Sequence, residues 1–452
     1  MKSPNIEFVN HASVLISNEE CSVLTDPWYQ DSVFHNGWSL LYENPEEEIA
    51  SVLSRTSYIY ISHEHPDHFN TGFFFNKKYK EIINERNIKI LFQQTKDHRV
   101  ANFLKKNGYD VIEISEGQNY KLSKNFSVQI IPSEFYDSAL ACNVDGINLI
   151  NLNDCPIHEE EDLLKFKKLH GIFDILITQF GYAAWKGGKQ NIGWRKKAAK
   201  EKIETVFKQV KILECKTVIP FASFIYFSNE INKYLNDSIN YPNEVKDYLT
   251  KRGVNTIFLA PKEKQSLTSL KQSEESLNFW QNKFDSINKK PLFSYKESVS
   301  NSSLDELFAT YKEKLFKKNS KLLIWLLYKT RVFGAFSKLV IHLIDHKQFY
   351  SYSIFNGLKK VDYNRTQPCI EMHSQSLAFI FKQEFGYDTL TVNACFEVKN
   401  DGFSVATNNF AIGSLNAMGF SLSMSILSRM DLVYKFLKRV YSAKKKIAQI
   451  EI

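Results

Sequence analysis

The feature that most constrains this chain is a cluster of potential metal ligands directly after a strand-like run. The sequence YIYISHEHPDHFN places His63, His65, Asp67 and His68 within six residues, after alternating aromatic and β-branched positions. The whole chain of 452 residues has 11 histidines, so three in one short turn indicate a function rather than a chance cluster. Imidazole and carboxylate groups suit zinc, iron or manganese. The segment therefore predicts one or two divalent metal ions, with Asp67 as a ligand that also orients an attacking hydroxide.

The first 230 residues alternate strand-like runs with helical stretches. Apolar runs such as ASVLI, FSVQIIP, INLIN and DILIT each end in polar or turn residues, and helical stretches such as 198–213 separate them. This alternation predicts a layered α/β fold. A polar stretch at 262–290 is expected to be helical or a linker rather than core. We therefore predict a catalytic domain over residues 1–290.

Residues 291–452 are predicted to form a separate C-terminal α+β domain of unknown role. Residues 304–343 have helical periodicity, and the runs SLAFIFKQEF, TLTVNACFEV and FSVATNNF predict a helix followed by strands. Basic residues surround the apolar ones between 321 and 346, so we expect packing against the catalytic domain, with binding to a membrane surface as the alternative. The most apolar run, 322–328, is far shorter than the ~20 residues that cross a bilayer.

Cysteine spacing and charge argue against several other classes of protein. The six cysteines lie far apart, with no CxxC and a single Cys-x-x-His from Cys155 to His158, which disfavours a disulfide framework, a zinc ribbon and a Rieske cluster. Free thiols and an N-terminus without a signal-like apolar core predict a cytoplasmic protein. The net charge of +8 is concentrated in residues 301–360, where basic residues are scattered among apolar ones. We therefore expect a small-molecule substrate and no nucleic acid.

The His-x-His-x-Asp-His segment resembles the signature motif of the metallo-β-lactamase superfamily. This resemblance covers residues 5–230 and implies an αββα sandwich with a mono- or dinuclear metal site between its sheets. Asp26 in VLTDPW is similar to the family's early Asp, and Asp154 in LINLNDC is similar to its metal-bridging Asp. NHASVLI resembles the opening of the N-acyl-phosphatidylethanolamine phospholipase D and ascorbate-lactonase branch. More specifically, DPWYQDSVFHNGWSLLYE, ISHEHPDHF and NLNDC resemble the metal-binding part of CMP-N-acetylneuraminate hydroxylases.

Two positions depart from the family pattern because they lack the usual His. In FSVQIIPSEFYDS the available residues are Ser133, Glu134 and Asp137. We expect Glu134 to replace the missing ligand there. In TVIPFASFIYF, Ser223 stands near the place of the last His. Residues that could fill a weakened position are His11, His35 and His158. A site richer in oxygen ligands favours iron or manganese over zinc alone.

Aromatic and cationic residues near these motifs predict the substrate contacts. The candidates are Trp28, Tyr29, Trp38, Lys186 and Lys189. Such a set suits a sugar, a nucleotide or a phosphate. The alternative is that the aromatic residues belong to the core and the lysines are solvated.

Three functions from different classes remain open at this stage. The first expectation is a metal-dependent hydrolase that acts on a small, phosphorylated or sugar-containing substrate through a metal-activated water. The second is a diiron oxygenase that hydroxylates a nucleotide-sugar-like substrate and takes electrons from a separate donor. The third is a metal-free binding or scaffold protein. The sequence leaves the metal, the substrate and the oligomeric state open.

Overall fold

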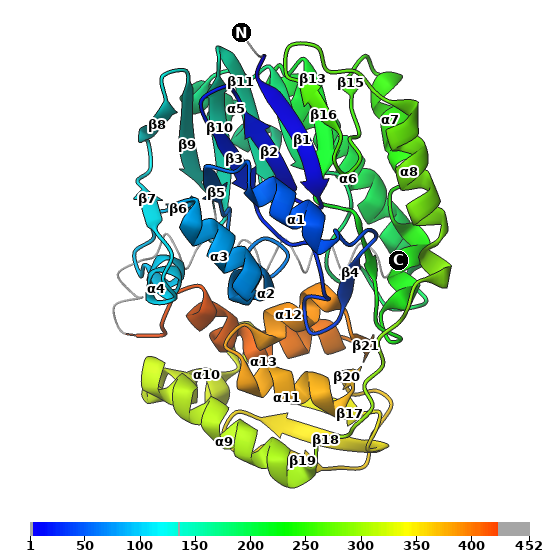
Figure 1. The fold of residues 1–452 in the computed structure, drawn as a ribbon. Coiled ribbons are helices and arrows are strands. Elements are labelled where there is room, and N and C mark those ends of the chain that lie inside the picture. The colour runs from blue at the N-terminus through cyan, green and yellow to red at the C-terminus, as the bar shows by residue number, and fades with distance from the viewer. Residues whose placement is uncertain (1–2, 134–135, 424–452) are drawn as a thin grey trace.

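Two seven-stranded sheets form the centre of the N-terminal part (Figure 1) in the computed structural model, which describes residues 3–133 and 136–423. The first sheet has the order β16 (Lys264–Ser266), β1 (Asn5–Asn10), β2 (Ser13–Ser17), β3 (Ser22–Thr25), β5 (Tyr58–Tyr60), β6 (Lys89–Gln93) and β7 (Val111–Ile114). The second has the order β15 (Asn255–Thr256), β13 (Thr217–Phe221), β12 (Ile175–Gln179), β11 (Ile147–Asn153), β10 (Ser138–Val144), β9 (Phe126–Pro132) and β8 (Asn119–Ser123).

Helices cover the outer face of each sheet. The helices beside the first sheet are α1 (Glu46–Leu53), α2 (Thr71–Phe75), α3 (Lys77–Glu85) and α4 (Arg99–Lys106). Those beside the second are α5 (Glu160–His170), α6 (Ile192–Ile212) and α7 (Pro242–Thr250). A small ribbon pairs β4 (Trp38–Leu40) with β14 (Ile225–Phe227), and η2 (Lys233–Ser238) follows it. The layers run αββα, which confirms the predicted sandwich.

Side-chain alternation along the strands explains why the first sheet is buried on both faces. Val14 and Ile16 of β2 belong to the core between the two sheets, as does Val23 of β3. Their neighbours Leu15 and Leu24 belong to the core beneath the outer helices. Because successive side chains of a strand point to opposite faces, nearly continuous apolar runs are needed when both faces are covered.

Residues 262–290 include a helix, as expected, but they also contribute side chains to the core, which the sequence interpretation did not expect. β16 pairs with β1 at the edge of the first sheet, and α8 (Glu274–Asp285) follows it, then η3 (Ile287–Lys289). Trp280 of α8 is fully buried and stacks on Phe224 with ring centroids 3.8 Å apart. The segment is polar on average, yet its few apolar residues share one helix face, which is sufficient for burial.

A five-stranded sheet organises the C-terminal part. Its order is β19 (Gly357–Lys360), β18 (Gln348–Ser353), β17 (Leu339–Leu343), β20 (Cys369–Met372) and β21 (Phe396–Lys399). The accompanying helices are α9 (Asn301–Lys318), α10 (Lys321–Thr330), η4 (Val332–Gly334), α11 (Ser374–Lys382), α12 (Gly386–Asn393) and α13 (Gly402–Ala417). This arrangement is mixed α and β, as predicted for this part.

Some secondary structure of the C-terminal part differs from the prediction. The helical stretch predicted over 304–343 is helical to residue 330 and then forms β17. The strand predicted in TLTVNACFEV is confirmed for 396–398, which belong to β21, whereas 389–393 lie in α12. The strand predicted in FSVATNNF is wrong, because 403–410 lie in α13. Ala406, Phe410 and Gly413 are on the buried side of α13. Their helical spacing matches the packing against β17 and β20, which outweighs the strand propensity of single residues.

The C-terminal part lies against one end of the sandwich (Figure 1) and shares a core with it. The Trp185 N–H donates to the Thr391 carbonyl over 2.8 Å, and Asn393 Nδ2 donates to the Phe34 carbonyl over 3.0 Å. These contacts are made by α12, and the packing expected for residues 321–346 stays a prediction. The domain boundary near residue 290 stays a prediction.

Helix α10 exposes apolar side chains to solvent. Leu322, Trp325 and Leu326 are 41–62% exposed, and Ile324 is its one buried residue. No helix in the described part of the chain has the length and apolar character needed to cross a membrane. Membrane-surface binding by this helix stays a prediction.

Candidate metal centre

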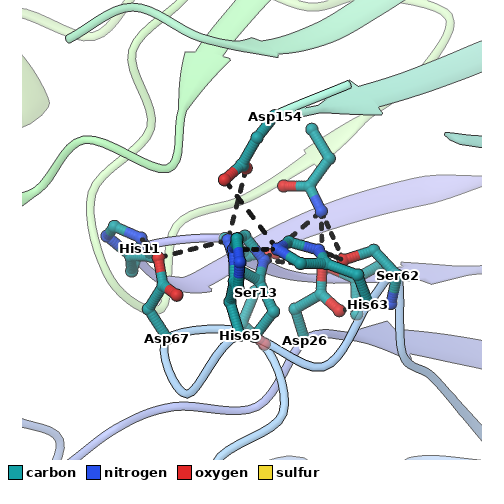
Figure 2. A network of polar contacts seen from close by, with 12 residues as sticks. His11, Ser13, Asp26, Ser62, His63, His65, Asp67 and Asp154 are labelled. Carbon is teal, nitrogen blue, oxygen red and sulfur yellow. Dashed lines mark hydrogen bonds and ion pairs between the residues drawn. The ribbon is translucent and has the colours of Figure 1, made fainter. Parts of the chain in front are cut away.

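Five loops bring the candidate ligands together between the two sheets (Figure 2). His63, His65, Asp67 and His68 lie in the turn after β5, and Asp154 follows β11. The additional contributions come from His11 between β1 and β2, Asp26 after β3 and Asp137 between β9 and β10. These strand ends are remote in sequence, so the centre exists only when both sheets have formed.

Asp67, His68 and His11 form one side of the centre. Asp67 Oδ2 lies 3.2 Å from His68 Nε2 and 3.6 Å from His11 Nε2. One ligand atom from each of these three residues lies within 4.8 Å of the other two. The three side chains are buried, and two nitrogens with one carboxylate oxygen make a donor set that suits a transition metal.

His63, His65 and Asp154 form the other side. His63 Nε2 lies 2.8 Å from His65 Nδ1 and 4.0 Å from Asp154 Oδ2. Asp154 Oδ1 lies 3.2 Å from His68 Nε2, so its two oxygens face the two sides of the centre. Asp154 is therefore placed to bridge two ions. His65 is exposed, and the centre is open to solvent beside it.

Asp137 adds a third carboxylate next to His63. Its Oδ1 lies 3.1 Å from His63 Nδ1. The loop that carries it is held to the turn after β5, because Ser138 Oγ donates to the Ser62 carbonyl over 2.6 Å. The Tyr60 hydroxyl lies 2.9 Å from the same Ser138 Oγ. Burial raises the pKa of Asp137 to about 7, and the nearby Asp154 carboxylate adds to this rise.

Asp26 and Asn153 orient the ligands from behind. Asp26 Oδ2 lies 3.2 Å from His68 Nδ1, so Nε2 of that ring points to Asp67 and Asp154. Asp26 Oδ1 accepts from the Ser62 N–H over 2.7 Å, and Oδ2 accepts from Asn153 Nδ2 over 3.0 Å. A carboxylate behind a ligating His fixes its tautomer and ring orientation.

Backbone strain accompanies these positions. His11 and Asp26 both have φ of 35°, and Asn153 has φ of 54°. Residues other than glycine rarely adopt positive φ, and each such residue costs about 1–3 kcal/mol. The surrounding hydrogen bonds hold the three residues in this conformation; the Ala222 N–H, for example, donates to the His11 carbonyl over 2.7 Å.

The electrostatics of the centre favour a cation. Burial alone would lower the pKa of His68, but the carboxylates of Asp154 and Asp67 raise it well above its usual range. Burial would likewise raise the pKa of Asp67, but His68 and His11 hold it well below its usual range. Burial lowers the pKa of His63 to about 4, so this ring is a neutral donor.

Unsatisfied polar atoms provide a direct test of whether a metal fits. Among the described residues, the buried side-chain atoms at the centre without a hydrogen-bond partner are His11 Nδ1, His68 Nε2, Asp67 Oδ1, Asp137 Oδ1 and Asp154 Oδ1. Leaving such atoms unpaired is costly, and the cost disappears when they bind a cation. The residues present therefore fit one or two metal ions.

The structure brings together five of the six predicted ligands, namely His63, His65, Asp67, His68 and Asp154. It differs from the sequence interpretation in the sixth ligand and in the additional histidines. Glu134, the expected substitute ligand, lies outside the described residues, and Asp137 from the same segment faces His63. Of the three additional histidines considered, His11 reaches the centre. His35 instead stacks on Phe379 with ring centroids 4.4 Å apart. Ser223 Oγ accepts from the Gly181 N–H over 2.7 Å, which is a backbone contact.

The predicted substrate residues divide into buried and accessible ones. Trp28 and Tyr29 are at most 2% exposed, which fits the alternative that these aromatic residues belong to the core. Trp28 Nε1 donates to the Gln30 carbonyl, and the Tyr29 hydroxyl is 2.7 Å from Ser13 Oγ. Trp38 is also buried and lines a small cavity with Ser223. Lys189 is exposed, and Lys186 is half-buried.

The family comparison matches the part of the chain that builds the centre. Residues 5–221 match a family model described as "Beta-lactamase superfamily domain". The match includes His11, the turn after β5 with residues 63–68, and Asp154. Residues 5–221 form a metallo-β-lactamase-superfamily domain. The matched residues include the His and Asp side chains that the fold brings together at the centre.

Curated relatives of this metallo-β-lactamase-fold chain are sialic-acid hydroxylases. The "Cytidine monophosphate-N-acetylneuraminic acid hydroxylase" of Danio rerio is 23% identical over 276 residues, which cover 57% of this chain and 44% of that protein. The protein of the same name from Sus scrofa is 24% identical over 254 residues, which cover 53% and 57%. The chain spans about half the length of the curated relatives that it matches.

Two solved structures resemble part of this chain at low identity and low TM-score. CmlA, a diiron β-hydroxylase from Streptomyces venezuelae, is 14% identical, with 59% of this chain and 55% of that chain covered and a TM-score of 0.41. Igni18, a metallo hydrolase from Ignicoccus hospitalis, is 14% identical, with 60% and 100% covered and a TM-score of 0.40.

The sequence interpretation named Asp137 but preferred Glu134, because the choice depends on the turn between β9 and β10. It did not single out Asn153, which precedes Asp154, although Asn is enriched at positive φ.

Proposed function

We propose that the chain is a dinuclear metalloenzyme that hydroxylates an anionic, nucleotide-sugar-like substrate with dioxygen. The observation that carries the proposal is the donor set, in which three carboxylates accompany four imidazoles. A site with this many carboxylate oxygens suits iron better than a site built from nitrogen and sulfur ligands. The names of the curated relatives favour hydroxylation and a sugar nucleotide as the substrate class.

The residues of the chain have separate tasks in this reaction. Asp154 faces both sides of the centre and would help to hold both irons. Asp26 faces Nδ1 of His68 and so directs Nε2 of that ring toward the centre, where a bound ion would take the place of its proton. The exposed side at His65 admits the substrate and dioxygen. Bound iron would supply the activation of dioxygen.

The electron balance requires a reductant. Hydroxylation of a C–H bond by dioxygen takes two electrons and two protons, places one oxygen atom in the product and releases the other as water. All six cysteines are free thiols, and the two possible metal clusters found in the described residues contain no cysteine. We therefore assign the electrons to a separate redox protein or a small-molecule donor.

Hydrolysis is the second candidate, because the same ligands can hold zinc. A redox-inactive ion lowers the pKa of a bound water and needs no electron donor. Asp67 would then orient the attacking hydroxide.

Metal analysis combined with oxygen consumption tests the proposal. The protein is purified without added metal and compared with a His65→Ala, Asp67→Ala double variant. His98→Asn is a matched control, because His98 pairs with Glu113 at 2.6 Å and lies outside the centre. We expect close to two equivalents of iron in the wild type and the control, and their loss in the double variant.

The second measurement is dioxygen uptake by the iron-loaded protein with a chemical reductant and a nucleotide sugar. Uptake that requires His65 and Asp67 supports the hydroxylase. Zinc in the wild type without dioxygen uptake favours the hydrolase. Absence of metal from all three proteins, including after reconstitution with iron or zinc, would overturn both functions.

A further inference from the structure

Helix α10 lies at an edge of the C-terminal part (Figure 1) and has apolar side chains on two faces. One face is turned to the protein, because Ile324 is fully buried and Leu327 packs against the C-terminal core. The other face is turned to solvent and carries three large apolar side chains, Leu322, Trp325 and Leu326. Spacings of three and four residues place these three side by side on the helix. A contiguous group of exposed apolar side chains is typical of an interaction surface, and we call this group the α10 surface.

The chain around the α10 surface is charged with one sign only. Residues 314–338 contain seven Lys or Arg and no Asp or Glu. All seven are exposed, namely Lys314, Lys317, Lys318, Lys321, Lys329, Arg331 and Lys338. Among the described residues, Lys318 is the one of the seven that forms an ion pair, with Glu384 at 2.7 Å. Lys329 Nζ lies 6.0 Å from the centre of the Trp325 ring, so positive charge directly borders the apolar group.

The described part of the chain ends beside the start of α10. The Ser320 N–H, at the N-cap of the helix, donates to the Leu422 carbonyl over 2.8 Å, and the Leu422 N–H donates to Asn319 Oδ1 over 2.7 Å. Residues 424–452 continue from this point with seven Lys or Arg and two acidic residues. Their net charge has the same sign as that around α10. The two regions therefore repel each other and attract the same anionic partner.

The chemistry of the α10 surface favours a lipid partner over another protein. Two copies of this chain that met through α10 would bring like charges together. Six of the seven cations are lysines, and protein interfaces are depleted in lysine and enriched in arginine. At a membrane, lysine stems extend along apolar surface while their charged ends reach the headgroups. Tryptophan prefers the same boundary between acyl chains and headgroups. Exposed leucines beside Trp325 and a lysine border thus match the layers of an anionic membrane surface.

We propose that the α10 surface docks this protein on a membrane that contains anionic phospholipids. Leu322, Trp325 and Leu326 enter the outer part of the acyl-chain layer, and the seven cations contact lipid phosphate groups. Residues 424–452 add positive charge to the same attachment. The helix has ten residues, so it lies along the membrane surface. This inference concerns the C-terminal part and does not depend on the proposed function.

Flotation of the whole chain with lipid vesicles tests the attachment. Vesicles of phosphatidylcholine alone are compared with vesicles that also contain phosphatidylserine. We expect binding to the anionic vesicles, weaker binding as salt is added, and little binding to phosphatidylcholine alone. Leu322→Gln, Leu326→Gln should weaken binding by about tenfold or more, because both leucines lose their burial in an apolar layer. If the wild type does not bind, or if this variant binds as tightly, docking through α10 is overturned.

Two leucines of α5 provide the matched control. Leu164 and Leu169 are 52% and 66% exposed, and Leu164→Gln, Leu169→Gln makes the same chemical change. Helix α5 has acidic residues in its first turn, so it lacks a purely basic border. We expect this control to bind the anionic vesicles as the wild type does. An equal loss of binding in the control would overturn the assignment to α10. Circular dichroism verifies that both double variants are folded.

Quenching by brominated acyl chains locates Trp325 in the bound protein. The chain has six tryptophans, so the signal of Trp325 is taken as the difference between the wild type and Trp325→Phe. We expect vesicles with brominated acyl chains to quench this difference signal and vesicles with ordinary chains to leave it. Flotation without quenching would mean that charge alone holds the protein to lipid, and it would overturn the insertion of α10.

Other occupants of the α10 surface give different results in solution. A second copy of the chain would form a dimer that Leu322→Gln, Leu326→Gln converts to a monomer. Cover by residues 424–452 would shield the Trp325 difference signal from acrylamide in the free protein. Either result without quenching by brominated lipid overturns the proposal. Quenching that is lost in Leu322→Gln, Leu326→Gln supports it.

Discussion

Asp26 has two carboxylate oxygens that face three nitrogens. Oδ1 accepts from the Ser62 N–H, and Oδ2 faces both Asn153 Nδ2 and His68 Nδ1. In Asp26→Asn, one of these oxygens becomes an NH₂ group, whichever way the amide is turned. If NH₂ faces Ser62, two donors meet in a buried place. If it faces His68, the imidazole proton moves to Nε2, the atom that must bind metal.

Either arrangement has a calculable consequence. A buried donor that loses its acceptor costs about 1–3 kcal/mol. Removal of the group behind a ligating His typically weakens metal binding by about 10–100-fold, which corresponds to about 1.4–2.8 kcal/mol. We therefore expect Asp26→Asn to lower the affinity for the metal bound by His68 by about 10–100-fold.

Competition with a chromophoric chelator measures this affinity on metal-free protein. Asp31→Asn is the control, because it makes the same chemical change at an exposed residue whose φ of 65° Asn also tolerates. Circular dichroism verifies that both variants are folded. Equal metal affinity of Asp26→Asn and the wild type would refute the role of Asp26 in fixing the tautomer.

Two further predictions concern pH and packing. Burial raises the folded-state pKa of Asp137 to about 7. Between pH 4 and 7 the metal-free folded protein therefore holds a proton that the unfolded chain has released. Because of this difference, the free energy of unfolding falls as the pH rises through this range. Asp137→Asn should therefore become more stable relative to the wild type from pH 5 to 7.5 in urea denaturation; a difference independent of pH would contradict this. Trp280→Ala removes a fully buried ring stacked on Phe224 and should cost about 3–5 kcal/mol of unfolding free energy, with a loss below 1 kcal/mol as the contrary result.

The sequence identified those features that depend on local patterns. Strands were visible because apolar runs ended in turns, and the ligand turn was visible because His63, His65, Asp67 and His68 are adjacent. Asp26 and Asp154 could be found through the family resemblance. The resemblance also limited the candidates for the missing ligands to a few residues.

The remaining features depend on contacts between distant segments. His11 reaches Asp67 because the turn between β1 and β2 lies over the centre, and no local pattern encodes that approach. The selection of Asp137 depends on how one turn directs its side chains. In α12 and α13, burial against neighbouring elements determines helix where residue propensity favours strand.

The contact between Gly37 and Asn393 has a consequence for how this protein unfolds. A Cβ atom at residue 37 would lie 2.3 Å from Asn393 Cβ, so the two segments meet too closely for any other side chain at that position. Asn232 Nδ2 donates to the carbonyls of both residues, at 2.9 and 2.6 Å, inside the protein. A fragment ending at residue 290 would expose these groups together with apolar residues of the shared core, among them Trp38 and Phe227. We therefore expect a single cooperative melting transition for the whole chain, and aggregation rather than an independently folded enzyme for the fragment.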